Sequence, residues 1–437
     1  MAFVPTGLIE VIAWGRTVGA LAPGRTRNAY VFEYDPAWVR SGIEISPIHM
    51  PTSRRQYTFP GLPLETFQGL PPSIADALPD KFGNGIIDAW LSREGVPTSS
   101  ITALDRLAYL GDRGLGALEF RPDTGAKDLP PSALDMQMLV QSARDAVAGT
   151  LTSDSESERA LQQIITVGTS AGGARAKAVV NFNSATQEIR PGHVLPAEGF
   201  EAWLLKFDGV GLDYQLGAGA NYGRIEYAYS KMARAAGITM TETRLLEENG
   251  RAHFMTKRFD RTSDRQKLHT QSLCGISILD FNATGTHDYA QYQGSIGELD
   301  LGLDARTEAF RRMVFNVVAA NCDDHTKNFG FLMDQSGQWS IAPAYDITHA
   351  FNPDGEWTHQ HLMSVNGEFG RIQRKDFLTF AERHGIERAA SIIGEVNDAV
   401  HSWPQFAVEA GLPAAVTDLV AKDHREVASA RKKPVRP

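Results

Sequence analysis

NCDDHTKNFGFLMDQSGQWSIAPAYD, residues 321–346, is the stretch that decides the fold. It follows an apolar stripe at helical spacing, which predicts a buried helix: Phe310, Met313, Val314, Val317 and Val318. Polar side chains come directly after this run: Asp323, Asp324, His325, Lys327 and Asn328. A polar loop at the end of a core helix is costly to bury unless it serves a site. The stretch therefore predicts a functional loop behind a core helix.

The spacing of the polar residues indicates which chemistry this loop serves. Asn328 follows Asp323 by five positions, the interval of the D-x-x-x-x-N catalytic loop of protein kinases, in which the Asp acts on the attacking hydroxyl and the Asn holds magnesium. Two apolar stretches separated by a turn at 334–337 lead to Asp346, which then takes the place of the second magnesium ligand. The alternative is a solvated turn in which Asp and Asn only serve turn geometry.

Composition describes an ordinary globular protein. The chain has 437 residues, a hydrophobic content of 42% and a net charge of −9, which argues against broad nucleic-acid binding through a basic surface. Its two cysteines, Cys274 and Cys322, lack metal-ligand spacing and fit a reducing cytoplasm. We see no signal peptide and no membrane span, so a cytoplasmic location is expected. A Pro-containing stretch at 121–135 marks the end of an N-terminal subdomain.

A Gly-rich segment lies upstream of the polar loop. ITVGTSAGGARAKAVVNF, residues 165–182, places small residues between two strand-like runs, so that backbone N–H groups can approach phosphate oxygens. It lacks the Lys of a Walker P-loop. The alternative is a plain Gly-rich hairpin, with Ser170 as a turn residue and Lys177 as a surface charge.

Three further features follow this segment. The strand-like run 201–209 carries Lys206 at its centre, either as the kinase lysine that grips the α and β phosphates or as a lysine extending from an edge strand. The helix predicted over 221–236 presents Glu226, either paired with Lys206 or exposed in the first turn. Asn249-Gly250 predicts a hairpin whose second strand ends at 257–259, where a kinase has its adenine-contacting hinge.

These features stand in kinase order, and at this point the chain resembles a known family, the HipA serine/threonine kinases of type II toxin–antitoxin systems. The resemblance covers nearly the whole chain and is carried by these segments: VIAWGRTVGAL, FEYDPAWV, ALPDKFGN, LGDRGLGALEF, TSAGGARAKAV, WLLKF, KRFDR, NCDDHTKNFGFL and APAYDI. It implies an α+β, bilobal protein-kinase-like fold. A β-rich N-terminal subdomain would span 1–130, a kinase N-lobe 131–261 and a mostly helical C-lobe 262–437.

The resemblance also implies residue roles. Asp323 matches the catalytic Asp, Asn328 and Asp346 match the Mg²⁺ ligands, and Lys206 matches the ATP-contacting Lys. The other positions that match nucleotide contacts are Gly172, Gly173, Ala174, Arg175, Ala176, Lys177, Lys257, Arg258, Phe259, His325, Thr326, Lys327 and Tyr345. Ser170, or Thr169 beside it, matches an autophosphorylated residue, and a phosphate there should disfavour ATP. Asp324 departs from the family, which often carries Gly there, and adds a negative charge near the γ-phosphate.

The family implies partners as well. Its protein targets include aminoacyl-tRNA synthetases, and a small HipB-like DNA-binding antitoxin holds the kinase inactive, which leaves DNA contact chiefly to that partner. Three rival interpretations remain. One is a small-molecule phosphotransferase of the aminoglycoside or choline type, and another is a catalytically silent binding protein. The third is a metallohydrolase built from Asp323, Asp324, His325 and His349, which leaves the Gly-rich loop and Lys206 without a purpose.

Overall fold

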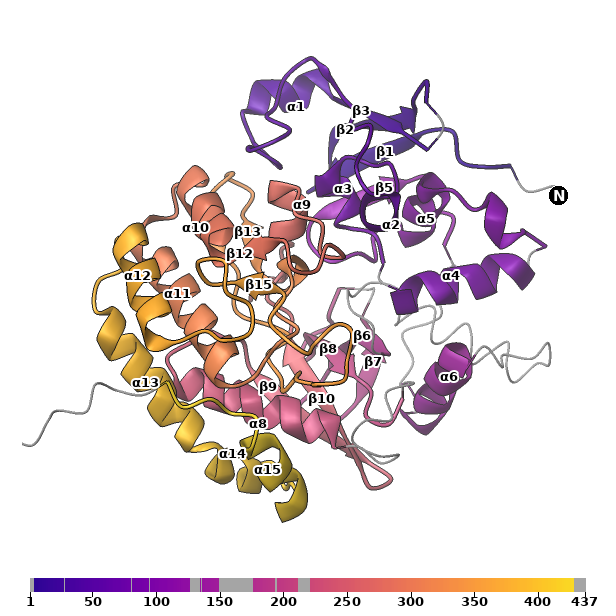
Figure 1. Cartoon of the computed structure of the whole chain (residues 1–437). Helices are drawn as coiled ribbons and strands as arrows, with labels where there is room; N and C mark the ends of the chain where they lie inside the picture. The colour runs from indigo at the N-terminus through magenta and orange to yellow at the C-terminus, as the bar shows by residue number, and fades with distance from the viewer. Residues whose placement is uncertain are drawn as a thin grey trace, which may run out of the picture. The chain divides into compact units, whose positions relative to one another are not determined.

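A computed structural model describes residues 4–26, 28–79, 81–93, 95–125, 134, 136–148, 176–192, 195–210 and 221–427 (Figure 1). The chain divides into two compact units. The first unit comprises the described residues within Met1–Gly223, Thr241–Ile278 and Phe331–Trp339, and the second those within Arg224–Met240, Leu279–Gly330 and Ser340–Pro437. Helices and sheets occur together, which confirms the predicted α+β class.

The first unit begins with an antiparallel sheet of order β4-β3-β2-β1-β5. Its strands are β1 (Ile9–Ala13), β2 (Arg16–Pro23), β3 (Tyr30–Tyr34), β4 (Gln56–Tyr57) and β5 (Leu118–Arg121). Trp14 and Gly15 connect β1 to β2 with φ of 52° and 72°, the left-handed geometry that two-residue hairpins favour. The short strands predicted over residues 8–34 are therefore confirmed.

A second antiparallel sheet in this unit has the order β7-β6-β8-β10-β9. Its strands are β6 (Lys177–Phe182), β7 (Ile189–Pro191), β8 (Glu201–Lys206), β9 (Thr243–Glu248) and β10 (Arg251–Lys257). Asn249 and Gly250 join β9 to β10 with φ of 44° and 77°, which confirms the predicted hairpin. β8 is the middle strand, as its apolar neighbours predicted.

The helices of the first unit are α1 (Pro36–Ser41), α2 (Leu64–Phe67), α3 (Pro72–Ala75), α4 (Lys81–Arg93), α5 (Ala103–Leu110), α6 (Met136–Ala148) and α9 (Leu273–Ser277). One apolar core joins α4 and α6 to the second sheet. Ile86 and Ile87 of α4 and Leu139 of α6 pack there with Trp203 and Leu205 of β8. Burial of these side chains fixes β8, and hence Lys206 at its end, within the unit.

Two small sheets complete the strands. One has the order β11-β13-β14, from β11 (His269–Ser272), β13 (Gly330–Met333) and β14 (Trp339–Ile341); the other pairs β12 (His287–Asp288) with β15 (Met363–Ser364) in parallel. Asp334 Oδ1 accepts the backbone N–H groups of Ser336 at 2.8 Å and of Gln338 at 3.0 Å, which closes the turn between β13 and β14. This is the hairpin predicted within the opening stretch.

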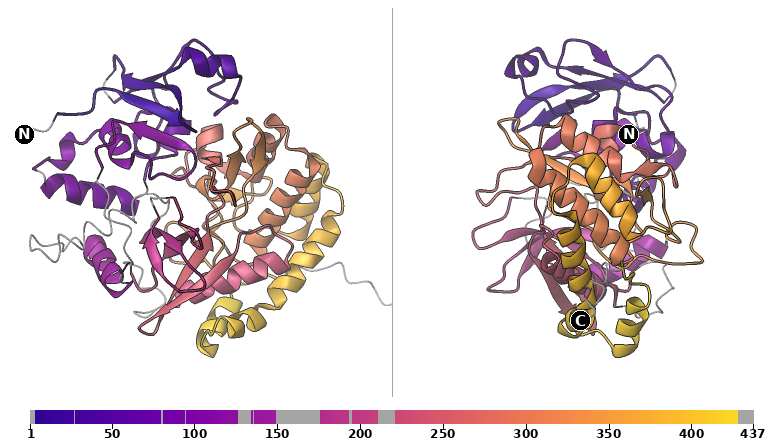
Figure 2. Two further views of the ribbon diagram at one scale, coloured as in Figure 1. Left: turned by 180° about the vertical axis from the view of Figure 1, so that it is seen from behind. Right: turned by 60° about the vertical axis from the view of Figure 1, so that its left-hand side comes forward.

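The second unit is mostly helical. Its helices are α8 (Tyr222–Ala235, from Arg224 on), α10 (Tyr289–Glu298), α11 (Gly302–Val318), α12 (Arg374–His384), α13 (Ala389–His401), α14 (Trp403–Glu409) and α15 (Ala414–Ala421). The helices α10 to α13 pack side by side, as Figures 1 and 2 show. The apolar stripe of α11 is buried, and Phe310 and Val317 are fully covered, which confirms the predicted core helix. None of the helices in the described part of the chain combines the length and apolar character that a membrane span needs.

Candidate functional site

The polar loop lies directly behind α11 in the second unit. α11 ends at Val318, and Ala320 turns the chain with a φ of 53°. Asn321 and Cys322 are still buried, whereas the Asp323 side chain is 40% exposed. The first side chain of this stretch to reach solvent is therefore that of Asp323, the residue that the spacing marked as catalytic.

Asp323 and Asn328 are joined by a hydrogen bond. The Asn328 side-chain amide donates from Nδ2 to the Asp323 backbone carbonyl at 2.7 Å. A 3-10 turn over Thr326–Asn328 makes this closure possible, with the Asn328 N–H donating to the His325 carbonyl at 2.9 Å. The five-residue interval therefore forms a closed loop that carries an accessible carboxylate at its start.

Other predicted residues of this loop support its shape. The Thr326 hydroxyl is buried and donates to the Leu279 carbonyl at 2.8 Å. Tyr345 donates its hydroxyl proton to the Lys327 carbonyl at 2.7 Å. The Lys327 ammonium lies 4.8 Å from the centre of the Phe281 ring, a cation–π distance. Thr326 and Tyr345 thus hold the loop through their hydroxyls.

Asp324 points into the core rather than toward solvent. Its Oδ2 accepts from the Tyr289 hydroxyl at 2.7 Å and from His361 Nδ1 at 3.0 Å, and its Oδ1 accepts from the Leu362 N–H at 2.7 Å. The side chains of Asp324 and His361 are both fully buried. The expectation that Asp324 adds a charge near the γ-phosphate is therefore corrected, because this carboxylate accepts its hydrogen bonds from donors in the core.

The environment of His361 explains how that carboxylate is neutralised. Burial by itself lowers the pKa of His361, but the attraction of Asp324 outweighs burial and raises the pKa to about 10. The imidazole is therefore cationic at neutral pH. Asn316 of α11 extends the network by donating to the Tyr289 hydroxyl at 3.0 Å. Sequence reasoning missed these partners.

Asp346 has an unusual backbone. Its φ of 53° is in the left-handed region, which non-glycine residues rarely adopt and which, when present, tends to cluster at functional sites. Asp and Asn tolerate this conformation better than most residues because their side chains are short and polar. The strain falls on a residue that the sequence marked as a cation ligand.

The donor atoms on Asn328 and Asp346 suit Mg²⁺. Because Asn328 uses its amide nitrogen to bind Asp323, the amide oxygen is the atom left for a cation, and Asp346 supplies a carboxylate. Mg²⁺ prefers such hard oxygen ligands and completes its shell with water and phosphate. Within the described ranges there is no group of three or more His, Cys, Asp or Glu side chains that would hold a metal by itself. Two members of the rival metallohydrolase cluster have other partners. Asp324 binds His361, and His349 Nε2 lies 2.9 Å from Asp423 Oδ2.

Two lysines face each other in the first unit. Lys177 of β6 and Lys206 of β8 are direct cross-strand partners, which places both side chains on the same face of the sheet. Lys177 is 2% exposed, and Lys206 is half-buried with its ammonium 5.8 Å from the centre of the Phe254 ring. The edge-strand alternative for Lys206 and the surface alternative for Lys177 are thus both excluded. Like charges at directly opposed positions repel each other, and an anion beside them reduces that repulsion.

Part of the Gly-rich segment lies outside the described residues. This applies to Ser170 and its neighbour Thr169, and to Gly172, Gly173, Ala174 and Arg175. Ala176 is described: it is fully buried, and its carbonyl accepts the Phe207 N–H at 3.0 Å just beyond Lys206.

The predicted hinge residues 257–259 begin at the last residue of β10. The N–H of Lys257 donates to the Glu242 carbonyl at 2.9 Å, and that of Arg258 donates to the Ala202 carbonyl at 3.0 Å. The Arg258 side chain forms a buried bidentate pair with Asp260 at 2.8 and 2.6 Å. Burial by itself raises the pKa of Asp260, but Arg258 and Arg261 outweigh burial and hold it well below its usual range. Arg258 is therefore a structural side chain, while Phe259 is half-buried.

Glu226 lies in the second turn of α8 and is 3% exposed. This excludes the exposed first-turn alternative. Its pairing with Lys206 stays a prediction.

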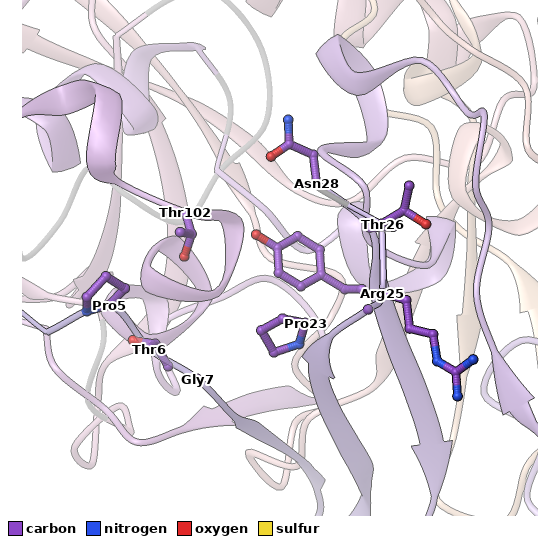
Figure 3. Close-up of a pocket in the computed structure, with 11 residues that line it drawn as sticks. Pro5, Thr6, Gly7, Pro23, Arg25, Thr26, Asn28 and Thr102 are labelled. Atoms are coloured by element: carbon purple, nitrogen blue, oxygen red, sulfur yellow. The ribbon is translucent and has the colours of Figure 1, made fainter.

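The first unit also contains a pocket of about 520 Å³. Its lining includes the polar side chains of Thr6, Thr26, Asn28 and Thr102 (Figure 3). No residue predicted for catalysis or nucleotide binding belongs to its lining. The pocket therefore gives no support to the predicted site.

Comparisons with known proteins show the family and the fold of the chain. Residues 169–403 match the family model described as the HipA-like C-terminal domain, and residues 9–121 match the HipA N-terminal domain. The fold is similar to that of a chain from the Shewanella oneidensis MR-1 toxin–antitoxin complex of HipA, HipB and operator DNA. The match covers 95% of each chain, with a TM-score of 0.67 and 18% identity.

The curated relatives match over a smaller share of the chain. A Haemophilus influenzae protein named "Putative kinase" is 23% identical over 233 residues, which is 46% of this chain and 68% of the relative. The Sinorhizobium fredii proteins "Putative kinase Y4dM" and "Putative kinase Y4mE" are 25% and 28% identical over 64% and 27% of this chain. The matches span 62% and 30% of those two relatives, less than two thirds of their length. Because the C-terminal family model alone covers more than half of the chain, and the N-terminal model matches the region before it, the chain belongs to the HipA family.

Proposed function

We propose that this chain is an ATP- and Mg²⁺-dependent kinase that transfers a phosphoryl group to a serine or threonine hydroxyl of a protein. The observation that carries the proposal is the closed loop of Asp323 and Asn328, held by the 2.7 Å hydrogen bond and opening on a carboxylate that is 40% exposed. Phosphoryl transfer needs a positioned residue that accepts the proton of the attacking hydroxyl, and an accessible carboxylate on a closed loop suits that role.

Each residue has a role that its chemistry supports. Asp323 would accept the proton of the attacking hydroxyl. The amide oxygen of Asn328 and the carboxylate of Asp346 would hold Mg²⁺, which when bound neutralises charge that develops on the transferring phosphoryl group. The hinge at 257–259 would meet the adenine, where Phe259 offers a half-buried ring.

The lysine pair supports an anionic ligand. Lys177 and Lys206 stand opposite each other on one sheet face, and Lys177 is almost fully buried. Two cations at this spacing repel each other, and a polyphosphate would relieve that repulsion while gaining charge-assisted hydrogen bonds. The two lysines together would therefore hold a multiply charged anion better than either could alone.

The family membership supports the biological part of the proposal. The structurally similar Shewanella chain comes from a complex with HipB and operator DNA. We infer that this chain likewise binds a HipB-like antitoxin and meets DNA through it. Its acceptor would be a cytoplasmic protein of the aminoacyl-tRNA synthetase class, and Ser170 or Thr169 would be the site of self-modification.

The test is transfer of labelled phosphate by the purified full-length chain. Native protein, Asp323→Asn and a control, Asp418→Asn, are incubated with Mg-ATP, alone and with a soluble protein extract, and phosphate is mapped by mass spectrometry. Asp418 is an exposed carboxylate on α15, so its loss should change nothing. We expect Ser170 or an added protein to be labelled by native and control chains only. Labelling of small alcohols instead would make the chain a small-molecule phosphotransferase, and undiminished labelling by Asp323→Asn would refute the assigned base.

A further inference from the structure

A tryptophan holds the side chain of Asp323. The Trp357 indole donates from Nε1 to Asp323 Oδ1 at 2.9 Å. The same Oδ1 lies 3.7 Å from His325 Nε2, whereas Oδ2 accepts no hydrogen bond from the described part of the chain. One carboxylate oxygen is therefore engaged by the protein, and the second is left for another donor.

This contact differs from the other indole contacts of the described chain. Side-chain donors in proteins commonly bind backbone carbonyls, and four indoles do so here: Trp14, Trp38, Trp339 and Trp403. Trp357 is half-buried like Trp14 and Trp339, but it donates instead to the accessible carboxylate of the proposed base. Burial alone does not explain that choice of acceptor.

Backbone hydrogen bonds close the loop that carries Trp357. The Asn352 N–H donates to the Thr358 carbonyl at 3.2 Å, and the Gly355 N–H donates back to the Asn352 carbonyl at 3.0 Å. The ring of Trp357 lies 6.3 Å from that of His325, which lies 5.5 Å from Phe281. Trp357 thus joins an aromatic cluster on one side of Asp323.

We infer that Trp357 is a positioning residue for phosphoryl transfer, which orients the Asp323 carboxylate so that Oδ2 receives the acceptor hydroxyl. This inference rests on the proposed function. Without the indole N–H, the carboxylate rotates about its side-chain bond, and fewer molecules present Oδ2 in the reactive direction. A small misplacement of a reacting group lowers a rate by about 10- to 100-fold.

The position of the contact predicts which kinetic constant changes. Trp357 acts on the group that meets the acceptor hydroxyl. Nucleotide binding is proposed to depend on other residues, including Lys206 and Asp346. The effect should therefore fall on kcat and leave the KM for ATP unchanged.

The experiment compares Trp357→Phe with Trp339→Phe in the full-length chain. Both substitutions keep an aromatic ring and remove one indole N–H, but Trp339 donates to the Glu44 carbonyl at 3.2 Å, which belongs to no proposed site residue. We expect Trp357→Phe to lower kcat about 10-fold or more, with the KM for ATP within about twofold of native. Trp339→Phe should match the native enzyme.

Three outcomes would overturn the inference. An unchanged kcat would show that the hydrogen bond does not matter for transfer, and a raised kcat would make it an inhibitory contact. Equal losses of kcat and ATP affinity, with a lowered Tm, would indicate a general structural role. Absence of transfer by the native chain would instead reject the proposed function itself.

A second measurement does not depend on activity. In protein with ¹⁵N-labelled tryptophan, the indole N–H signal of Trp357, assigned from its disappearance in Trp357→Phe, should move when Asp323 is replaced by Asn. A signal that stays in place would contradict the hydrogen bond and with it the positioning role.

Discussion

Asp323 and Asp324 are neighbours in the chain with opposite environments. The Asp323 side chain is 40% exposed and Asp324 is fully buried, where it accepts hydrogen bonds from Tyr289, His361 and the Leu362 N–H. The buried carboxylate fixes the backbone at the point where the accessible carboxylate leaves the core. The interior network therefore sets the direction of the proposed base.

We expect Asp324→Asn to destabilise the protein by about 3–5 kcal/mol, because it leaves the buried His361 without its counter-charge. Urea unfolding of the variant measures the loss. The exposed Asp418→Asn should stay within about 0.5 kcal/mol of native. A loss of less than about 1 kcal/mol in Asp324→Asn would mean that the pair does not stabilise the loop.

The same pair predicts a loss of stability at alkaline pH. The pKa of His361 is about 10 in the folded chain, raised by Asp324 against the effect of burial, and about 6.5 when unfolded. A raised pKa means that the folded state binds the proton more tightly, so the contribution is complete below about pH 6.5 and disappears as the pH rises through about 10. The difference in unfolding free energy between native and Asp324→Asn should shrink over this range. A constant difference would contradict a protonated His361.

Sequence reasoning reached the parts of the site that local pattern encodes. The interval between Asp323 and Asn328 is short enough for one loop, and the structure closes it with a hydrogen bond. The apolar residues around Lys206 predicted a middle strand, and β8 is one. Asn249-Gly250 predicted its hairpin because both residues accept a positive φ.

The residues that support the site escaped prediction because their partners are distant in sequence. His361 is 37 positions from Asp324, and Trp357 is 34 from Asp323. A hydrogen bond over such a separation leaves no periodicity in either segment. Asp324 was misjudged for the same reason: its position beside Asp323 suggested a shared environment, whereas its side chain meets donors from other segments.

Removing one of the two facing lysines should weaken nucleotide binding without changing the stability of the chain. Lys206→Met should weaken Mg-ATP binding by about 10- to 100-fold, since a charge-assisted contact to phosphate is removed. The free energy of unfolding without ligand should change by less than about 1 kcal/mol, because relief of the repulsion with Lys177 offsets the interactions that the Lys206 ammonium makes. Titration calorimetry and thermal unfolding measure the two quantities. Lys375→Met, an exposed lysine on α12, is the control, and equal ATP affinity in both variants would remove Lys206 from the nucleotide site.

Acid should destabilise the second unit through His424. Burial, with smaller contributions from His349 and His401, lowers the pKa of His424 to about 4, and its Nε2 lies 2.9 Å from the Tyr229 hydroxyl. The unfolded chain binds this proton near pH 6.5, so the stability that His424 contributes is complete above that pH and is lost as the pH falls toward 4. His424→Gln should lower the slope of unfolding free energy against pH in this window by up to about 1.4 kcal/mol per pH unit. Identical slopes would show that His424 does not titrate with folding.

Substitutions of Asp346 should separate the stability of the chain from its activity. Its φ of 53° costs an ordinary residue about 1–2 kcal/mol, whereas glycine adopts it freely and loses about 0.5–1 kcal/mol through the entropy of the unfolded chain. In Asp346→Gly the relief of the backbone offsets the lost interactions of the side chain and the entropy of glycine, so the free energy of unfolding should stay within about 1 kcal/mol of native while Mg²⁺-dependent phosphoryl transfer is lost. Asp346→Asn, which tolerates the same backbone, should keep the stability and also lose transfer, since it removes the charge but not the shape. Thermal unfolding and phosphate transfer measured on both variants test this. Variants with reduced stability would show that Asp346 is retained for folding, and variants with native activity would show that its carboxylate does not hold the cation.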